Sequence, residues 1–490
     1  GVDNSCPCHT EPRRNQPSTL TKNMTSSHIN RRTFLAGSGL SLGSAALNNF
    51  LLAENIAPGK RPAYLLPKAK AKRVIFLCMA GGPSHLETFD YKPKLDEMNG
   101  KLMPESFTKG QPIAQLQGKE LKVQGHMTKF KRHGQGGQYV SDFMPWTAKM
   151  ADDIAIIRSL VTEQINHDPA HTFINTGTAI NGRPSMGAWV NYGLGSESKD
   201  LPGFVVMTSI GGRNPQPIAS RQWGAGFLPS RFQGVEFNSA GDPVHYVSNP
   251  KGTTPQTQGK LVNTITALDR HRNRIIHDPE TATRIAAYEM AFRMQSSVPE
   301  LMDVSKEPQH ILDMYGAKPG DGSYASNCLL ARRLAERGVR FIHLYHRGWD
   351  HHGGLVQYMN KCCGLTDKPT WALIQDLKQR DMLKDTLVVW GGEFGRTPMF
   401  QGKGGAGRDH HIKGFSMWMA GGGVKGGVGY GETDDLGYNS VKDIVNVRDL
   451  HATMLHQLGI NHERFTAKHQ GLDWRLSGVL KSRVVKEILT

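Results

Sequence analysis

The sequence predicts a mostly parallel, doubly wound α/β sheet within one large domain. Continuous apolar runs such as residues 74–79 are typical of strands buried on both faces. Helical patterns alternate with the strand-like runs, which indicates right-handed crossovers between parallel strands. A chain of 490 residues with 38% hydrophobic and 21% charged residues can bury such a core, and this balance excludes disordered and collagen-like proteins.

The first half of the chain supplies three predicted strands. Residues 74–79 form the first, which stops at a Gly-Gly-Pro turn. The next strands are predicted at residues 154–159, after a short helix around 146–150, and at residues 204–207. A helical pattern then predicts an inserted layer at about residues 258–316.

The helix–strand alternation returns in the second half. Two of its predicted helices have recognisable caps: Gly338 follows one helix, and Asp449 precedes another. The predicted elements are, in order, a helix at 329–337 ended by Gly338, a strand at 339–345, a helix at 371–383, strands at 386–390 and 415–420, and a helix at 450–458 capped by Asp449.

The charge of the chain does not indicate a nucleic-acid partner. The formal net charge is +16, but residues 1–72 hold ten Lys and Arg against three Asp and Glu. The remainder has no basic stripe interleaved with aromatic residues, so we expect a solvated basic surface and no nucleic-acid binding. The six cysteines form no repeated Cys-x-x-Cys pair, which excludes a zinc-finger pattern and a disulfide scaffold.

The N-terminal segment contains an export motif. Residues 30–35, Asn-Arg-Arg-Thr-Phe-Leu, precede a weakly apolar stretch at 36–52 that is rich in Gly, Ser and Ala, as in twin-arginine signals. That stretch is a poor membrane span, so the mature chain is expected to lack a stable transmembrane segment. We predict recognition by the twin-arginine export machinery and a periplasmic or extracellular location. The predicted parts are a signal with an upstream extension at 1–57, a linker at 58–72 and the domain at 73–490.

Metal-ligand residues gather in loops after the predicted strands. In a parallel α/β sheet, ligands bind at the carboxyl ends of the strands. Four loops are rich in His, Asp and Glu, at residues 82–87, 347–353, 392–397 and 408–411. Imidazole and carboxylate together suit a divalent metal, here Zn²⁺, Mn²⁺ or Ca²⁺. The preferred ligands are Asp350, His352, Glu393 and His410, with His351 or His411 as a further ligand or a supporting partner.

Two glycine-rich loops have patterns found in binding sites. Arg132 and His133 precede Gly-Gln-Gly-Gly, whose backbone N–H groups could bind an anion, although a surface turn explains the pattern equally well. The Gly-x-Gly-x-x-Gly pattern at residues 421–426 leads into more glycine instead of a helix, so it does not indicate a dinucleotide site.

The loops together resemble one protein family. The motifs Gly-Gly-Pro-Ser-His-Leu-Glu, Gly-Trp-Asp-His-His-Gly, Gly-Glu-Phe-Gly-Arg-Thr-Pro and Gly-Arg-Asp-His-His are similar to those of the secreted, sulfatase-like domain of unknown function 1501 family. The resemblance implies the alkaline phosphatase and sulfatase type of fold, with hydrolysis of phosphate or sulfate esters at one or two metals. It places Glu393, His410, Asp350 and His352 at metal-ligand positions.

The chain departs from that family pattern at two places. Where sulfatases carry their nucleophile in a Cys-x-Pro-x-Arg stretch, this chain has His167-x-Pro169-x-His171. The first strand lacks the metal-binding Asp of the relatives, which leaves Ser84, His85 or Glu87 as substitutes.

The sequence therefore predicts a metal-dependent hydrolase of phosphate or sulfate esters, acting on an anionic small molecule or polysaccharide ester. His167 is expected to act as general base or nucleophile. The alternative is a non-catalytic, metal-containing surface or binding protein that kept the fold. The remaining expected site residues are His171 as catalytic, His85 as a metal ligand, and Arg396, Ser84 and His133 as contacts to the substrate anion.

Overall fold

A computed structural model describes residues 61–216, 218–244, 252–276, 279–402 and 406–490, which belong to one compact unit, Gly59–Thr490. The predicted twin-arginine signal falls on residues outside the described part. None of the described helices is both long enough and apolar enough to cross a lipid bilayer.

The main sheet of the described chain has nine strands. They pair in the order β12, β4, β11, β8, β1, β7, β5 and β6, and β15 pairs with β4. All neighbours are parallel except β11, which is antiparallel to β8 and β4. This confirms the mostly parallel sheet. The strands are β1 (Arg73–Ala80), β4 (Ile154–Val161), β5 (Phe204–Arg213), β6 (Val235–Phe237), β7 (Phe341–Trp349), β8 (Thr386–Gly391), β11 (Phe415–Ala420), β12 (Val428–Tyr430) and β15 (Val445–Asn446).

Strand β1 lies at the centre of the sheet, between β7 and β8, and all of its residues are buried. Because side chains alternate along a strand, Ile75 and Leu77 enter the apolar cluster on one face, while Val74 and Phe76 enter the cluster on the other. A strand covered on both faces needs apolar residues at every position, which explains the continuous run in the sequence.

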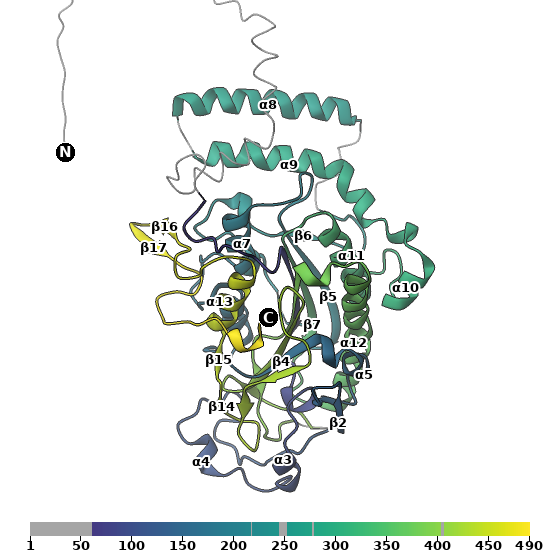
Figure 1. The fold of residues 1–490 in the computed structure, drawn as a ribbon, viewed down its shortest axis with the longest axis vertical. Helices are drawn as coiled ribbons and strands as arrows, with labels where there is room; N and C mark the ends of the chain where they lie inside the picture. Colours follow the sequence, from purple (N-terminus) through teal and green to yellow (C-terminus); the bar gives the residue numbers. More distant parts are fainter. Residues whose placement is uncertain (1–60, 217, 245–251, 277–278, 403–405) are drawn as a thin grey trace, which may run out of the picture. The chain divides into compact units, whose positions relative to one another are not determined.

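Helices cover both faces of the sheet, so the doubly wound arrangement is confirmed. Figure 1 shows α11 and α12 on one side of the strands and α7 and α13 on the other. The helices that pack with the first cluster are α5 (Pro145–Lys149), α11 (Tyr324–Glu336) and α12 (Leu355–Gln379). Those that pack with the second are α6 (His167–Thr176), α7 (Met186–Leu194) and α13 (Val447–Gln457).

The remaining elements are the inserted helical layer and several short pieces. The layer consists of α8 (Pro255–Ile276), α9 (Pro279–Met302) and α10 (Gln309–Tyr315), close to the predicted insertion. The short elements are α3 (Pro93–Glu97), α4 (Glu105–Thr108), β2 (Phe130–His133), β3 (Gln138–Ser141), β9 (Gly395–Arg396), β10 (His410–His411), β13 (Glu432–Thr433), β14 (Ser440–Lys442), β16 (Ala467–His469) and β17 (Leu472–Trp474).

Two helix predictions need correction. Helix α12 begins at Leu355, well before the predicted start at residue 371, and contains Pro369 in its interior. The buried Cys362 and Cys363 of its first half belong to the core, so packing outweighs the cost of the proline. In α13, Asn446 is the N-cap, and Asp449 bonds back to its N–H as the third helical residue of a capping box.

Residues 61–72, the described part of the predicted linker, pack against the rest of the domain. Tyr64 is buried and its hydroxyl donates to the carbonyl oxygen of Gly193. The backbone N–H groups of Leu66 and Lys70 donate to carbonyl oxygens of residues 459 and 457. Composition rich in Pro, Ala and Lys therefore did not distinguish a bound extended segment from a free one.

Candidate metal centre

The site forms where three neighbouring strands end. Gly81 follows β1, Asp350 follows β7 and Glu393 closely follows β8. Because β1 pairs in parallel with both β7 and β8, these carboxyl ends adjoin at one edge of the sheet. His167 at the start of α6 and His410 in β10 complete the site from two further segments. The loops that the sequence singled out thus converge.

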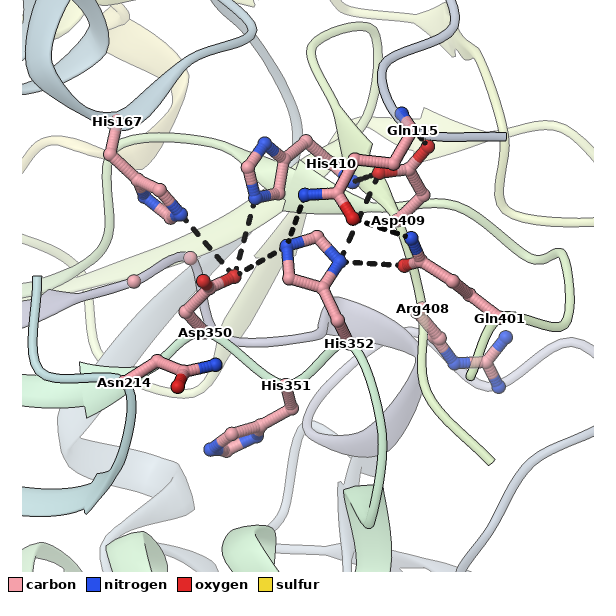
Figure 2. Close-up of polar contacts among 12 residues, drawn as sticks. Gln115, His167, Asn214, Asp350, His351, His352, Gln401, Arg408, Asp409 and His410 are labelled. Atoms are coloured by element: carbon pink, nitrogen blue, oxygen red, sulfur yellow. Dashed lines mark hydrogen bonds and ion pairs between the residues drawn. The ribbon is translucent and has the colours of Figure 1, made fainter. Parts of the chain in front are cut away.

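Three imidazoles surround one carboxylate oxygen. Figure 2 shows His167, His352 and His410 pointing toward Asp350. Their Nε2 atoms lie 3.3, 2.9 and 3.2 Å from Asp350 Oδ1. One ligand atom from each of these four residues lies within 4.8 Å of every other. The four side chains come from three separate parts of the chain.

The other ring nitrogen of each histidine faces an oxygen that can only accept a hydrogen bond. The three contacts are His167 Nδ1 to Glu393 Oε1 at 2.6 Å, His352 Nδ1 to Gln401 Oε1 at 2.6 Å, and His410 Nδ1 to the carbonyl oxygen of Ile165 at 2.8 Å. Each Nδ1 therefore carries a proton, and in the neutral ring each Nε2 presents its lone pair to the centre of the cluster.

These residues fit a bound cation. Three imidazole lone pairs that converge on one carboxylate oxygen repel it and one another, and a cation among them would relieve that repulsion. His167 Nε2 is buried and has no hydrogen-bond partner, although it lies close to Asp350. Burial lowers the pKa of His167, but its interactions with the carboxylates of Asp350 and Glu393 raise it more, so the net shift is upward. A proton on His167 Nε2 can therefore lie where the surrounding ligand atoms would hold a metal ion.

Glu393 anchors the inner side of the cluster. Its carboxylate is fully buried and accepts the N–H of Gly81 at 3.0 Å and the Nδ1 proton of His167. His171 Nε2 lies 3.4 Å from Glu393 Oε1, so His167, His171 and Glu393 form a second group of potential ligands. Burial raises the pKa of Glu393, but the charges of His171 and His167 together with hydrogen bonds lower it to about 2.

A glycine permits this close arrangement. Gly81 has a φ of +123°, and a Cβ at this position would lie 2.5 Å from the backbone nitrogen of Asp350. Only glycine allows both this backbone conformation and the contact between the β1 and β7 loops.

The profile of the Protein of unknown function (DUF1501) family matches residues 71–489. The chain belongs to the DUF1501 family. Among curated proteins, the chain has no match.

Solved structures similar to this DUF1501 chain include sulfatases and an alkaline phosphatase. The PsFucS1 sulfatase from Pseudoalteromonas sp. is 12% identical with a TM-score of 0.32, and the match covers 86% of this chain and 72% of that one. TAB5 alkaline phosphatase with Mg bound is 9% identical with a TM-score of 0.33, over 80% of this chain and 99% of that one. Ps i-CgsB in complex with k-i-k-neocarrahexaose is 9% identical with a TM-score of 0.34, over 82% and 75%. At these sequence identities and TM-scores, the similarity says nothing about the substrate or the activity of this chain.

In this DUF1501 chain, the buried guanidinium of Arg396 contacts the cluster through Asp350 and is not open to solvent. It is almost fully buried, and its Nη2 lies 2.7 Å from Asp350 Oδ1. The same guanidinium donates to the carbonyl oxygens of Gly81, Gly82 and Arg408. Burial raises the pKa of the Asp350 carboxyl, but Arg396 and the histidines hold it far below its usual range. Arg396 therefore keeps Asp350 ionised.

Ser84 belongs to a separate buried ion pair. Arg408 donates to both carboxylate oxygens of Glu87, at 2.9 and 2.7 Å, and the Ser84 hydroxyl donates to the same carboxylate. Burial raises the pKa of Glu87, but the charge of Arg408 lowers it below its ordinary value. Ser84 and Glu87 thus hold the loop after β1 in place.

Several predicted site residues lie apart from the ligand groups. His85 belongs to neither group, and its Nε2 contacts the carbonyl oxygen of Gly437 at 2.8 Å. His351 contacts the carbonyl oxygen of Gly348 and points away from His352, as Figure 2 shows. His411 Nε2 faces the carbonyl oxygen of Tyr438 at 2.6 Å.

His133 lies near the other edge of the sheet. It ends β2, and in the turn that follows it the N–H of Gln135 donates to Asp152, just before β4 begins. Because β4 runs in the same direction as β1, this is the amino edge. The structure therefore separates His133 from the candidate metal centre.

The sequence did not reveal the amide side chains around the cluster. Gln216 Nε2 donates to Asp350 Oδ2 at 2.9 Å, and Gln115 Nε2 lies 3.2 Å from His352 Nε2. Gln401 links His352 to Gln115. Its Oε1 accepts from His352 Nδ1, and its Nε2 donates to Gln115 Oε1. None of these glutamines lies in a motif. Only Asp409, which accepts the N–H of Gln115 and of His410, lay within a loop already identified.

Proposed function

We propose that this DUF1501 chain is an exported, metal-dependent hydrolase of phosphate or sulfate esters. The observation that supports the proposal is the arrangement of His167, His352 and His410 around Asp350. Their Nδ1 atoms are held by oxygen acceptors, and their Nε2 atoms converge on one carboxylate oxygen. Second contacts of this kind orient metal-binding histidines in proteins.

The donor set favours a borderline metal over a hard one. Three imidazole nitrogens and one carboxylate oxygen suit Zn²⁺, and Mn²⁺ after it, whereas Ca²⁺ prefers a shell of oxygens. When bound, such an ion would polarise the ester oxygen and lower the pKa of a bound water.

The surrounding residues would hold the ligands and leave one side open. Arg396 and Gln216 fix the two oxygens of Asp350, and Glu393 fixes His167. The side chains of His352 and His167 are 18% and 12% exposed, against 5% for His410. We therefore expect an anionic ester to approach past His352 and His167, with His410 at the inner side.

The role of His167 can be tested directly. As a ligand held between Asp350 and Glu393, it leaves water as the nucleophile. A nucleophilic His167 would instead form a covalent phosphoryl intermediate with phosphate esters. Mass spectrometry of protein quenched during turnover of 4-nitrophenyl phosphate should find no added phosphoryl group on residues 167–176.

The main experiment compares metal content and turnover in matched variants. The wild type should bind about one Zn²⁺ or Mn²⁺ per chain by elemental analysis and hydrolyse 4-nitrophenyl phosphate or sulfate. His352→Ala should lose both properties by at least about tenfold. His133→Ala removes a histidine at the other edge of the sheet and should change neither. Full activity in the metal-free protein would exclude the proposed mechanism.

One observation favours the non-catalytic alternative. Arg396 and Arg408 are both buried and already bonded to carboxylates and carbonyl oxygens, so neither is free to receive a substrate anion. A protein that binds metal through His352 but fails to hydrolyse a panel of phosphate and sulfate esters would support a metal-containing surface or binding protein.

The export proposal rests on the Asn-Arg-Arg-Thr-Phe-Leu motif at residues 30–35. Replacing both arginines by lysine should block transfer out of the cytoplasm in a bacterial host. Export that persists in the double variant and in a host without the twin-arginine machinery would contradict it.

A further inference from the structure

Helix α8 forms the outer face of the inserted layer. It packs along α9, which in turn contacts α11, and Figure 1 shows α8 on the far side of α9 from the sheet. Val262 and Thr266 of α8 are buried. One face of α8 is therefore used for packing within the described chain, which leaves the opposite face to solvent.

That solvent face carries an apolar stripe, which we define as Leu261, Leu268 and Ile275. These side chains are 51%, 65% and 70% exposed. Their spacing of seven residues is close to two helical turns, so the three align along one side of the helix. Exposed apolar residues that occur singly are normal, whereas here three of them recur at a fixed spacing on one side of a single helix.

Basic residues flank the stripe. Between Lys260 and Ile276, α8 has four cationic residues, Lys260, Arg270, Arg272 and Arg274, and one acidic residue, Asp269. Arg270 pairs with Glu289 of α9. At roughly 100° per residue, Lys260 and Arg274 lie on one side of the stripe and Arg272 on the other. The apolar row is therefore bordered by two cations on one side, and by Arg272 together with Asp269 on the other.

We propose that the outer face of α8 docks on an anionic lipid surface. An apolar stripe bordered by Lys and Arg is the pattern of helices that lie in the membrane interface, with apolar side chains among the acyl chains and cations at the lipid phosphates. The charge argues against a second copy as the occupant, because two such helices would bring like charges together. This surface is separate from the candidate metal centre and does not depend on it.

The test uses the full chain and sedimentation with lipid vesicles. The wild type should bind vesicles that contain phosphatidylglycerol and phosphatidylcholine, bind weakly to pure phosphatidylcholine, and detach at high salt. The variant L261S/L268S/I275S should bind roughly tenfold more weakly, as should K260Q/R272Q/R274Q. Both sets of residues are exposed, so the circular dichroism spectrum and the melting temperature should stay unchanged.

A matched control removes exposed apolar residues elsewhere. Val479 and Leu480 are 87% and 57% exposed near the C-terminus, and V479S/L480S should bind vesicles like the wild type. Vesicle binding that is absent in the wild type, or unchanged in both α8 variants, would overturn the proposal. A dimer in light scattering that L261S/L268S/I275S abolishes would also overturn it and would identify a second copy as the occupant.

Discussion

Replacing Glu393 by Gln tests whether this carboxylate orients His167 or binds the metal itself. The change keeps the size of the side chain and removes its charge. In the structure Glu393 accepts from His167 Nδ1 at 2.6 Å and from Gly81 N at 3.0 Å, and it lies 3.4 Å from His171 Nε2.

The size of the effect follows from these contacts. The surroundings lower the pKa of Glu393 from 4.5 to about 2, which corresponds to about 3 kcal/mol in favour of the charged form. Only part of this acts through His167, because the carboxylate also contacts Gly81 and His171. Loss of an orienting partner typically weakens metal binding by about 10- to 100-fold, and we expect Glu393→Gln to fall within that range.

The assay is competition for Zn²⁺ with a chromophoric chelator at pH 7.5. The matched control is Asp367→Asn, which neutralises a buried carboxylate that caps α5 instead. Unchanged Zn²⁺ affinity in Glu393→Gln would refute the orienting role. Complete loss of metal would show that Glu393 is a ligand, as the second group with His171 permits.

The same variant has a pH signature. Because the folded pKa of Glu393 lies below the unfolded value, its contribution to stability is present above about pH 4.5 and is lost as pH falls toward 2. Metal-free Glu393→Gln should therefore show a shallower loss of unfolding free energy across that window than the metal-free wild type, measured by denaturant titration. An identical slope would contradict the pKa shift.

Three further predictions concern two residues that frame the site, Gly81 and Arg408, and one carboxylate away from it, Asp367. Gly81→Ala should cost about 3 kcal/mol of unfolding free energy and weaken metal binding, because its Cβ would strike Asp350; wild-type melting and metal content would contradict this. Arg408→Met should cost about 3–5 kcal/mol in denaturant titration by leaving Glu87 unpaired in the interior, and a loss below 1 kcal/mol would refute the pairing argument. Burial outweighs hydrogen bonds and raises the pKa of Asp367 to about 6, so about 3 kcal/mol of stability present below pH 4 should be lost as pH rises past 6. Asp367→Asn should remove that slope, and an unchanged slope would exclude the shift.

The sequence predicted the sheet well because its signals are local. The run at residues 74–79 is apolar at every position, and β1 is buried on both faces in the structure. Helix α12 begins well before the predicted residue 371 and continues through Pro369, because the tertiary packing of Cys362 and Cys363 holds its first half in the core. Propensity describes the isolated segment, and packing acts on the folded one.

The candidate site was predicted only in part, because local motifs identify its loops but not the directions of their side chains. Asp350, His352 and His410 lie in motif-rich loops, and the parallel pairing of β1, β7 and β8 brings such loops to one edge. The direction of a side chain is not encoded in its spacing, so only the family resemblance favoured His352 over His351 and His410 over His411. Gln401 and Gln115 carry no pattern at all, and their role is visible only from the distances.

The candidate ligand residues are far apart in the sequence, and this sets when a metal could be bound by all of them. His167 begins α6, Asp350 and His352 follow β7, and His410 lies in β10. A growing chain must emerge as far as residue 410 before all four donors exist, so an ion held by all four could bind only late in synthesis. The ion would be selected in the compartment where the whole sheet is assembled, by whichever metal is available there at that moment.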